Sequence, residues 1–127
     1  MKYFVVDSFT DELFRGNPAG VCVLDKWKSD NLLQKIAFEN NLAETAFIVK
    51  NDNLYDLRWF SPETEIDLCG HATLASTFIL KNYYDKNCNF FSFSTKSGIL
   101  TVTFIENSGL YELDFLHGNQ KKLKLME

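Results

Sequence analysis

The stretch RWFSPETEIDLCGHATLAS, residues 58–76, runs from an aromatic strand through an acidic loop into a Cys-Gly-His turn and then into a helix. The helix decides the fold, because Ala72–Leu80 contains no charged residue. Its apolar side chains recur at helical spacing and form one stripe: Leu74, Ala75, Phe78 and Ile79. A helix that is apolar over most of its surface is buried rather than laid on a surface. We therefore predict a helix from Ala72 to near Tyr84 that is enclosed by sheet.

The segments on either side of this stretch contain further elements. Ser29 has the character of an N-cap, and the spacing of apolar residues predicts a second helix from Asp30 to Asn40. Residues 15–20, RGNPAG, have the composition of a turn. Strand-forming residues predict strands at 2–8, 21–24, 44–50, 54–60, 89–95, 99–106 and 110–116. This order is typical of an α+β fold, with largely antiparallel strands packed on a helix rather than alternating βαβ units.

Composition limits the class of protein. A length of 127 residues, of which 46% are hydrophobic and twelve are phenylalanine, predicts one domain with a packed core. The net charge of −4 argues against nucleic acid as a partner, and we interpret the basic cluster Lys121, Lys122 and Lys124 as a solvated tail. No apolar run is long enough for a membrane helix, and the N-terminus does not have the pattern of a signal peptide. The three cysteines form neither a disulfide framework nor a zinc pattern, so we expect a cytoplasmic protein without a metal.

The Cys-Gly-His turn is a candidate binding site because it opens a helix. The first turn of a helix leaves N–H groups unpaired, so Gly70, His71 and Ala72 could hold a carboxylate or an oxyanion. We expect the same positive potential to make Cys69 ionise more easily than a free thiol and to favour neutral His71. The structural alternatives are a small core cysteine and a satisfied histidine, and spacing alone favours them. Two ligands do not make a metal site.

Glu44 is the second candidate, because it interrupts the apolar segment Leu42–Val49. Strand alternation places it on one face with Ala46 and Ile48, where partial burial would raise the pKa of the carboxyl toward the range useful for proton transfer. The alternative is a charge at the end of a strand that points to water, and the residues alone favour it. The third candidate, GNPAG at residues 16–20, is either a turn or an amide-lined notch beside the Cys-Gly-His turn.

Three motifs in register resemble a known family. VDSFTDELFRGNPAGVCVL, NLAETAFIV and RWFSPETEIDLCGHATLAS, between Val6 and Ser76, resemble the N-terminal half of the PhzF-like family of phenazine-biosynthesis-type isomerases. Beyond Asn82 the resemblance lies only in the strand-rich character. The family shares the fold of diaminopimelate epimerase and proline racemase, which consists of two similar lobes with the active site in the cleft between them. Each lobe is a mostly antiparallel sheet wrapped around a central helix, and the resemblance implies that this chain is one such lobe.

The resemblance also implies roles for single residues. Glu44 matches the family's proton-transfer residue, and Gly70 and His71 match its substrate pocket. Asn17 and Ala72 complete the set of residues that we expect to bind substrate. The implied chemistry is proton transfer on a small carboxylic acid without a cofactor.

Cys69 lies where the epimerase and racemase relatives carry a catalytic cysteine. The PhzF-like motif does not require a cysteine there, so Cys69 is either a racemase-like base or an incidental small residue, and we favour the second. Three hypotheses follow: an isomerase lobe that needs a second lobe, an inactive remnant or interaction module with the same fold, and a cysteine-based racemase or epimerase. Because a lone lobe exposes its cleft face, we expect self-association or binding of a complementary second lobe.

Overall fold

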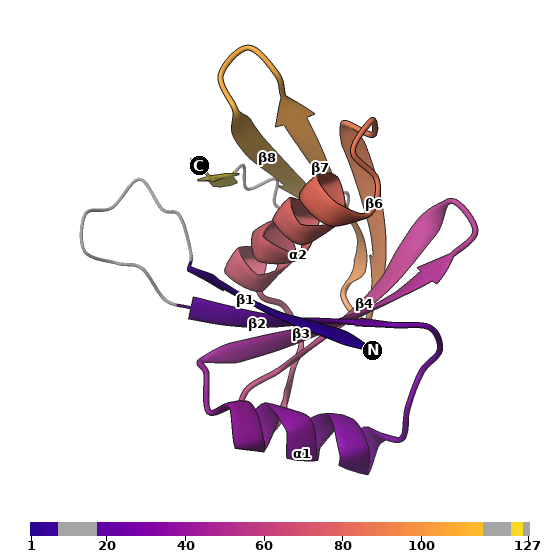
Figure 1. The fold of residues 1–127 in the computed structure, drawn as a ribbon, viewed down its shortest axis with the longest axis vertical. Coiled ribbons are helices and arrows are strands. Elements are labelled where there is room, and N and C mark those ends of the chain that lie inside the picture. The colour runs from indigo at the N-terminus through magenta and orange to yellow at the C-terminus, as the bar shows by residue number, and fades with distance from the viewer. Residues whose placement is uncertain (8–17, 116–122, 126–127) are drawn as a thin grey trace.

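The computed structural model describes residues 1–7, 18–115 and 123–125, which form one sheet and two helices (Figure 1). The elements are β1 (Lys2–Asp7), β2 (Pro18–Leu24), α1 (Asp30–Asn40), β3 (Glu44–Asn51), β4 (Leu54–Phe60), β5 (Glu65–Ile66), α2 (Gly70–Tyr83), β6 (Phe90–Thr95), β7 (Gly98–Ile105), β8 (Leu110–Phe115) and β9 (Leu123–Leu125). Both helices and all seven strands predicted from the sequence are present, and the short strands β5 and β9 are additional.

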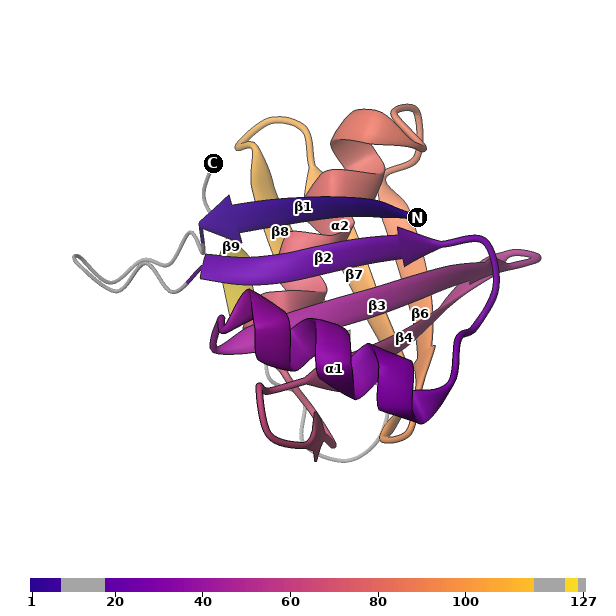
Figure 2. The same ribbon diagram turned by 60° about the horizontal axis from the view of Figure 1, so that its bottom comes forward.

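The sheet is mixed and follows the order β1-β2-β3-β4-β6-β7-β8-β9, with β5 paired to β4. In the described part of the chain, only β2 with β3 and β4 with β6 are parallel, and the other pairings are antiparallel. Each parallel pair is joined through a helix, because parallel neighbours need a crossover connection. The α+β prediction is confirmed, and the two crossovers are a feature that the strand pattern did not reveal. The sheet curls around α2, and α1 covers its outer face (Figures 1 and 2).

The central helix α2 is buried along most of its length, which confirms the prediction from its charge-free sequence. Its buried residues are Ala72, Thr73, Leu74, Ala75, Ser76, Thr77, Ile79 and Leu80. They pack against inward-facing side chains of β1 to β4 and β6 to β8. The buried hydroxyls of Thr73, Ser76 and Thr77 donate to carbonyl oxygens four residues earlier, at 2.7, 2.7 and 2.9 Å. The last turn of α2 reaches the surface, where Tyr83 is 61% exposed.

A second core lies between α1 and the outer face of the sheet. Leu33 and Ala37 of α1 pack there against residues of β2, β3 and β4: Cys22, Leu24, Phe47, Val49 and Phe60. Ser29 caps the helix, since its hydroxyl accepts a 3.2 Å hydrogen bond from the Leu32 N–H, as predicted. The C-cap residue that follows the helix is Asn41, which adopts the left-handed conformation with φ of 52°. This core holds the start of β3 in place.

Two parts of the sequence differ from expectation. Pro18, Ala19 and Gly20 belong to β2 rather than to a turn, while residues 15–17 lie outside the described residues. Gly20 is needed for close packing, because a Cβ there would lie 3.0 Å from the Tyr3 hydroxyl and 3.2 Å from the Thr45 hydroxyl. Of the basic cluster interpreted as a tail, Lys124 lies in β9, and Lys121 and Lys122 lie outside the described residues. Among the described helices, none is long and apolar enough to span a bilayer.

We predict that Thr73→Val destabilises the protein by about 1–3 kcal/mol, because it leaves a buried indole N–H without an acceptor. The Thr73 hydroxyl accepts a 3.1 Å hydrogen bond from Nε1 of Trp59, which is only 1% exposed. Urea denaturation followed by tryptophan fluorescence measures the change. Thr77→Val is the matched control, since it removes a buried hydroxyl that donates to the carbonyl of its own helix. An equal loss in both variants would contradict the role given to the Trp59 hydrogen bond.

Candidate active site

The start of α2 and the starts of β2 and β3 lie at one end of the sheet (Figures 1 and 2). Cys69 is the N-cap residue of α2 and has extended backbone angles, with φ of −144° and ψ of 104°. Glu44 is the first residue of β3 and is paired with Ala19 of β2. The fold therefore brings the two strongest candidates from the sequence, Glu44 and the Cys-Gly-His turn, to the same corner of the molecule.

The carboxylate of Glu44 lies beside the thiol of Cys69. The pKa of Cys69 is raised to about 12: burial contributes most, the charge and hydrogen bond of Glu44 act in the same direction, and the N–H groups of Ala72 and His71 act in the opposite direction. The prediction that Cys69 ionises easily is wrong. The positive end of a helix favours a thiolate, but burial and a neighbouring carboxylate both disfavour it, and together they are the larger effect. At neutral pH the thiol is protonated and acts as a donor toward Glu44.

The other residues expected to bind substrate differ in how far they are buried. Gly70 is half-buried in the first turn of α2, and the side chain of His71 is exposed. The side chain of Ala72 is fully buried in the core, so only its backbone can contribute to binding. Asn17 lies outside the described residues. Glu44, Gly70 and His71 thus share one corner, with a carboxylate, a helix start and an imidazole.

Two residues that the sequence did not single out, Asn40 and Thr45, contact each other beside the start of β3. Thr45 is fully buried, and its hydroxyl accepts a 3.3 Å hydrogen bond from the side chain of Asn40, the last residue of α1. This contact links the end of α1 to the start of β3. A buried threonine directly after the candidate acid, within an apolar strand, is the signal that could have identified it. Thr45 directly follows Glu44 in β3, so this contact lies next to the candidate acid.

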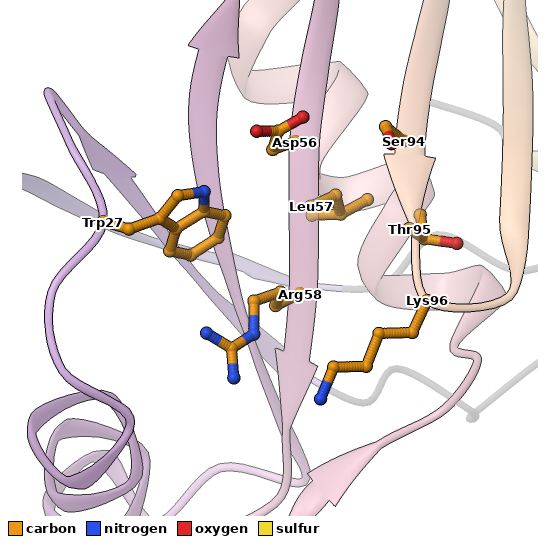
Figure 3. Close-up of a pocket in the computed structure, with 7 residues that line it drawn as sticks. All are labelled: Trp27, Asp56, Leu57, Arg58, Ser94, Thr95 and Lys96. Atoms are coloured by element: carbon orange, nitrogen blue, oxygen red, sulfur yellow. The ribbon is translucent and has the colours of Figure 1, made fainter.

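A second group missed by the sequence analysis lines an open groove of about 300 Å³ on the outside of β4 and β6 (Figure 3). The groove is lined by Trp27, Asp56, Leu57, Arg58, Ser94, Thr95 and Lys96. The guanidinium of Arg58 binds the carboxylate of Glu65 through two hydrogen bonds of 2.8 and 2.9 Å. This pair holds the pKa of Glu65 at about 2, chiefly through the hydrogen bond from Arg58. A single arginine between the apolar residues of a strand, with an acidic residue in the following loop, is the signal for this pair.

The described residues contain no group of three or more His, Cys, Asp or Glu side chains arranged to hold a metal ion. Comparison with known proteins identifies the family of this chain. Residues 6–118 match the family PhzC-PhzF, described as phenazine biosynthesis-like protein. The chain belongs to the PhzF-like family.

Individual relatives agree with this assignment. The PhzF-like chain is 54% identical over 102 residues to an uncharacterized isomerase of Pseudomonas aeruginosa, covering 80% of this chain and 39% of the relative. The crystal structure of a putative phenazine biosynthesis PhzC/PhzF protein from Clostridium difficile is 57% identical, with a TM-score of 0.80, and the match covers 89% of this chain and 43% of that one. A Pseudomonas aeruginosa structure described as a predicted epimerase has a TM-score of 0.71 at 23% identity, over 88% of this chain and 42% of that one, and shares the fold.

The PhzF-like chain spans less than half the length of each of these proteins. Its fold is that of a single lobe of the epimerase-like architecture, as the resemblance implied. In the described residues, the curled sheet and α2 form one continuous core.

We predict that Glu44→Gln makes Cys69 react faster with iodoacetamide at pH 8. Removing the neighbouring negative charge lowers the pKa of the thiol, and each pKa unit corresponds to about a tenfold change in thiolate. Peptide mass spectrometry measures labelling at Cys69 separately from the other cysteines. Glu39→Gln on the outer helix is the matched control and leaves the rate unchanged. Equal rates in the Glu44 variant and the unmodified protein would contradict the placement of the carboxylate beside the thiol.

Proposed function

We propose that this chain is a lobe of a PhzF-like isomerase and supplies Glu44 as its proton-transfer group. One observation carries the proposal: Glu44 lies at the start of α2 beside a thiol that stays protonated. A carboxylate can take a proton from a carbon of the substrate and, as the resulting carboxylic acid, return it to a second carbon. One proton is removed and one is returned, so the reaction is an isomerisation that needs no cofactor. Between the two steps the carboxylic acid can exchange its proton with water, so solvent deuterium enters the product.

The substrate that suits this corner is a small carboxylic acid. Its carboxylate would lie at the start of α2, where the positive end of the helix dipole and the N–H groups of the first turn favour an anion. Gly70 leaves room for close approach, and the exposed imidazole of His71 can donate a hydrogen bond to the bound acid. Asn17 remains a proposed binding residue, and Ala72 is proposed to contribute through its backbone. The opposite wall of the site would come from a second lobe.

A cysteine-based racemase is less well supported. A thiol with a pKa of about 12 is a poor general base at neutral pH, because almost none of it is thiolate. Cys22 is fully buried in the outer core, so it cannot serve as a second base at this corner. The free cysteines agree with the proposed cytoplasmic location.

We predict that Glu44→Gln abolishes incorporation of deuterium from D2O into a panel of small carboxylic acids, with a loss of roughly 10²–10⁴-fold. The assay uses the chain alone and mixed with the C-terminal part of the Clostridium difficile relative. Cys69→Ala is the matched control and retains exchange.

Two other outcomes are informative. Exchange lost in the cysteine variant and kept in the glutamine variant would overturn the assignment and favour the racemase. Absence of exchange in the unmodified chain, even with the added second lobe, would favour an inactive remnant or an interaction module.

We propose that the lobe pairs with another copy or with a complementary second lobe. The proposal follows from the match to less than half of each relative, which implies that the opposite wall of the site comes from elsewhere. Large apolar side chains exposed on four elements could be covered in part by such pairing: Val5, Phe38, Tyr83 and Phe90 are 56%, 63%, 61% and 57% exposed. We predict that sedimentation at high micromolar concentration shows a dimer or larger species, or a one-to-one complex once the second lobe is added. A clean monomer that does not bind the second lobe would contradict the proposal.

A further inference from the structure

The segment between β4 and α2, residues 61–69, ends in the Cys-Gly-His turn but contains little regular structure. Its only described strand is β5, which consists of Glu65 and Ile66 and pairs with Phe60 and Trp59. A connection of this length with two residues of strand does not fix its own end. The position of the turn must therefore come from contacts with neighbouring elements.

Glu65 provides the strongest of these contacts. Its carboxylate accepts hydrogen bonds of 2.8 and 2.9 Å from Arg58 and of 2.7 Å from Lys96. The side chain of Glu65 is only 18% exposed, so solvent screens these charges weakly. Figure 3 shows the side chains of Arg58, from β4, and Lys96, from the turn after β6, extending to the same side. A two-pronged guanidinium–carboxylate contact fixes orientation as well as distance.

Arg58 is itself held in one orientation. Its guanidinium carbon lies over two aromatic rings, 5.4 Å from the centroid of Trp27 and 5.3 Å from that of Phe60. The third guanidinium nitrogen, Nη1, forms a 3.0 Å ion pair with Asp30, whose side chain is 79% exposed. Stacking over rings and a bidentate pair are properties of arginine that lysine does not reproduce.

A second anchor lies closer to the turn. The hydroxyl of Ser97, in the turn between β6 and β7, donates a 2.6 Å hydrogen bond to the carbonyl oxygen of Asp67. Asp67 is two residues before Cys69. Lys96 and Ser97 therefore tie the connection to the far half of the sheet, while Arg58 ties it to β4.

β4 is also linked to the Cys-Gly-His turn from the core side of the sheet. Successive residues of a strand point to opposite faces, so Trp59 enters the core next to the outward-facing Arg58. The Trp59 indole donates to the Thr73 hydroxyl, which in turn donates a 2.7 Å hydrogen bond to the carbonyl oxygen of Cys69. Arg58 thus contacts the connection from the outer face of the sheet, and Trp59 is linked to the start of α2 from the core.

We propose that Arg58 and Glu65 are positioning residues, which hold the Cys-Gly-His turn in register with Glu44 from outside the active-site corner. The proposal rests on the proposed function for its consequence in catalysis, but the positioning itself can be measured without turnover. Loss of the pair would let residues 61–71 shift while the two cores remain packed. The turn would then open locally, which exposes Cys69 and separates it from Glu44.

The test compares Arg58→Lys and Glu65→Gln with Asp30→Asn. Asp30→Asn is the matched control, because it removes a charge that contacts Arg58 but leaves the pair with Glu65 intact. In the first two variants we expect labelling of Cys69 by iodoacetamide at pH 8 to rise about tenfold, and in the control to stay unchanged. Hydrogen exchange at the amides of His71 and Ala72 should rise with it, whereas exchange at the buried Leu100 and Val102 of β7 should not.

The outcomes separate positioning from general stability. Faster exchange at β7 to the same degree as at the turn would show a global loss of stability and overturn the proposal. Unchanged labelling and exchange at the turn in Arg58→Lys and Glu65→Gln would overturn it as well. Failure of the proposed function has a different signature, since it abolishes deuterium incorporation in the unmodified chain and leaves these measurements unaffected. If the function holds, both variants reduce the rate of deuterium incorporation, and Asp30→Asn does not.

Discussion

The structure depends on the burial of one helix that carries no charge along its buried length. α2 can be enclosed because its apolar side chains meet sheet on several sides and its hydroxyls bond to its own carbonyls. The sheet must curl to surround it, and the short parallel contact of β4 with β6, at Tyr55 with Phe93 and Asp56 with Ser94, joins the two halves of that curl. Enclosing the helix also brings its beginning to the corner of the sheet where β3 starts, and that beginning is one side of the candidate site.

The sequence was sufficient for most of the fold, because local patterns decide it. The absence of charge between Ala72 and Leu80 and the cap at Ser29 both lie within a few residues of the elements they specify. β5 and β9 could not be predicted, since strands of two or three residues are too short to show alternation. The parallel pairings were also missed, because they depend on which distant strands become neighbours and leave no local pattern.

The candidate site was predictable in its members and not in its electrostatics. Glu44 interrupts an apolar run, and the Cys-Gly-His turn opens an apolar helix, so both stand out in the sequence. Their proximity, and the effect of burial and of the Glu44 carboxylate on Cys69, follow from tertiary packing. The helix start was visible in the sequence and favoured a reactive thiol, whereas the opposing effects came from residues that only the fold brings close. The pair of Arg58 and Glu65 left a local signal, an arginine in an apolar strand followed by an acidic loop, but its contacts with Asp30 and Lys96 join residues that lie far apart in the chain.

The protonated thiol of Cys69 also bears on redox chemistry. Oxidation of cysteine by peroxides proceeds through the thiolate, and susceptibility follows thiolate content and exposure. A half-buried thiol with a pKa of about 12 offers little thiolate in neutral solution. A carboxylate does not undergo this oxidation, so the proposed proton transfer through Glu44 would not be lost by the route that inactivates enzymes with a catalytic thiolate. The burial of Cys69, together with the neighbouring Glu44 carboxylate, would thereby also protect the site from oxidative damage.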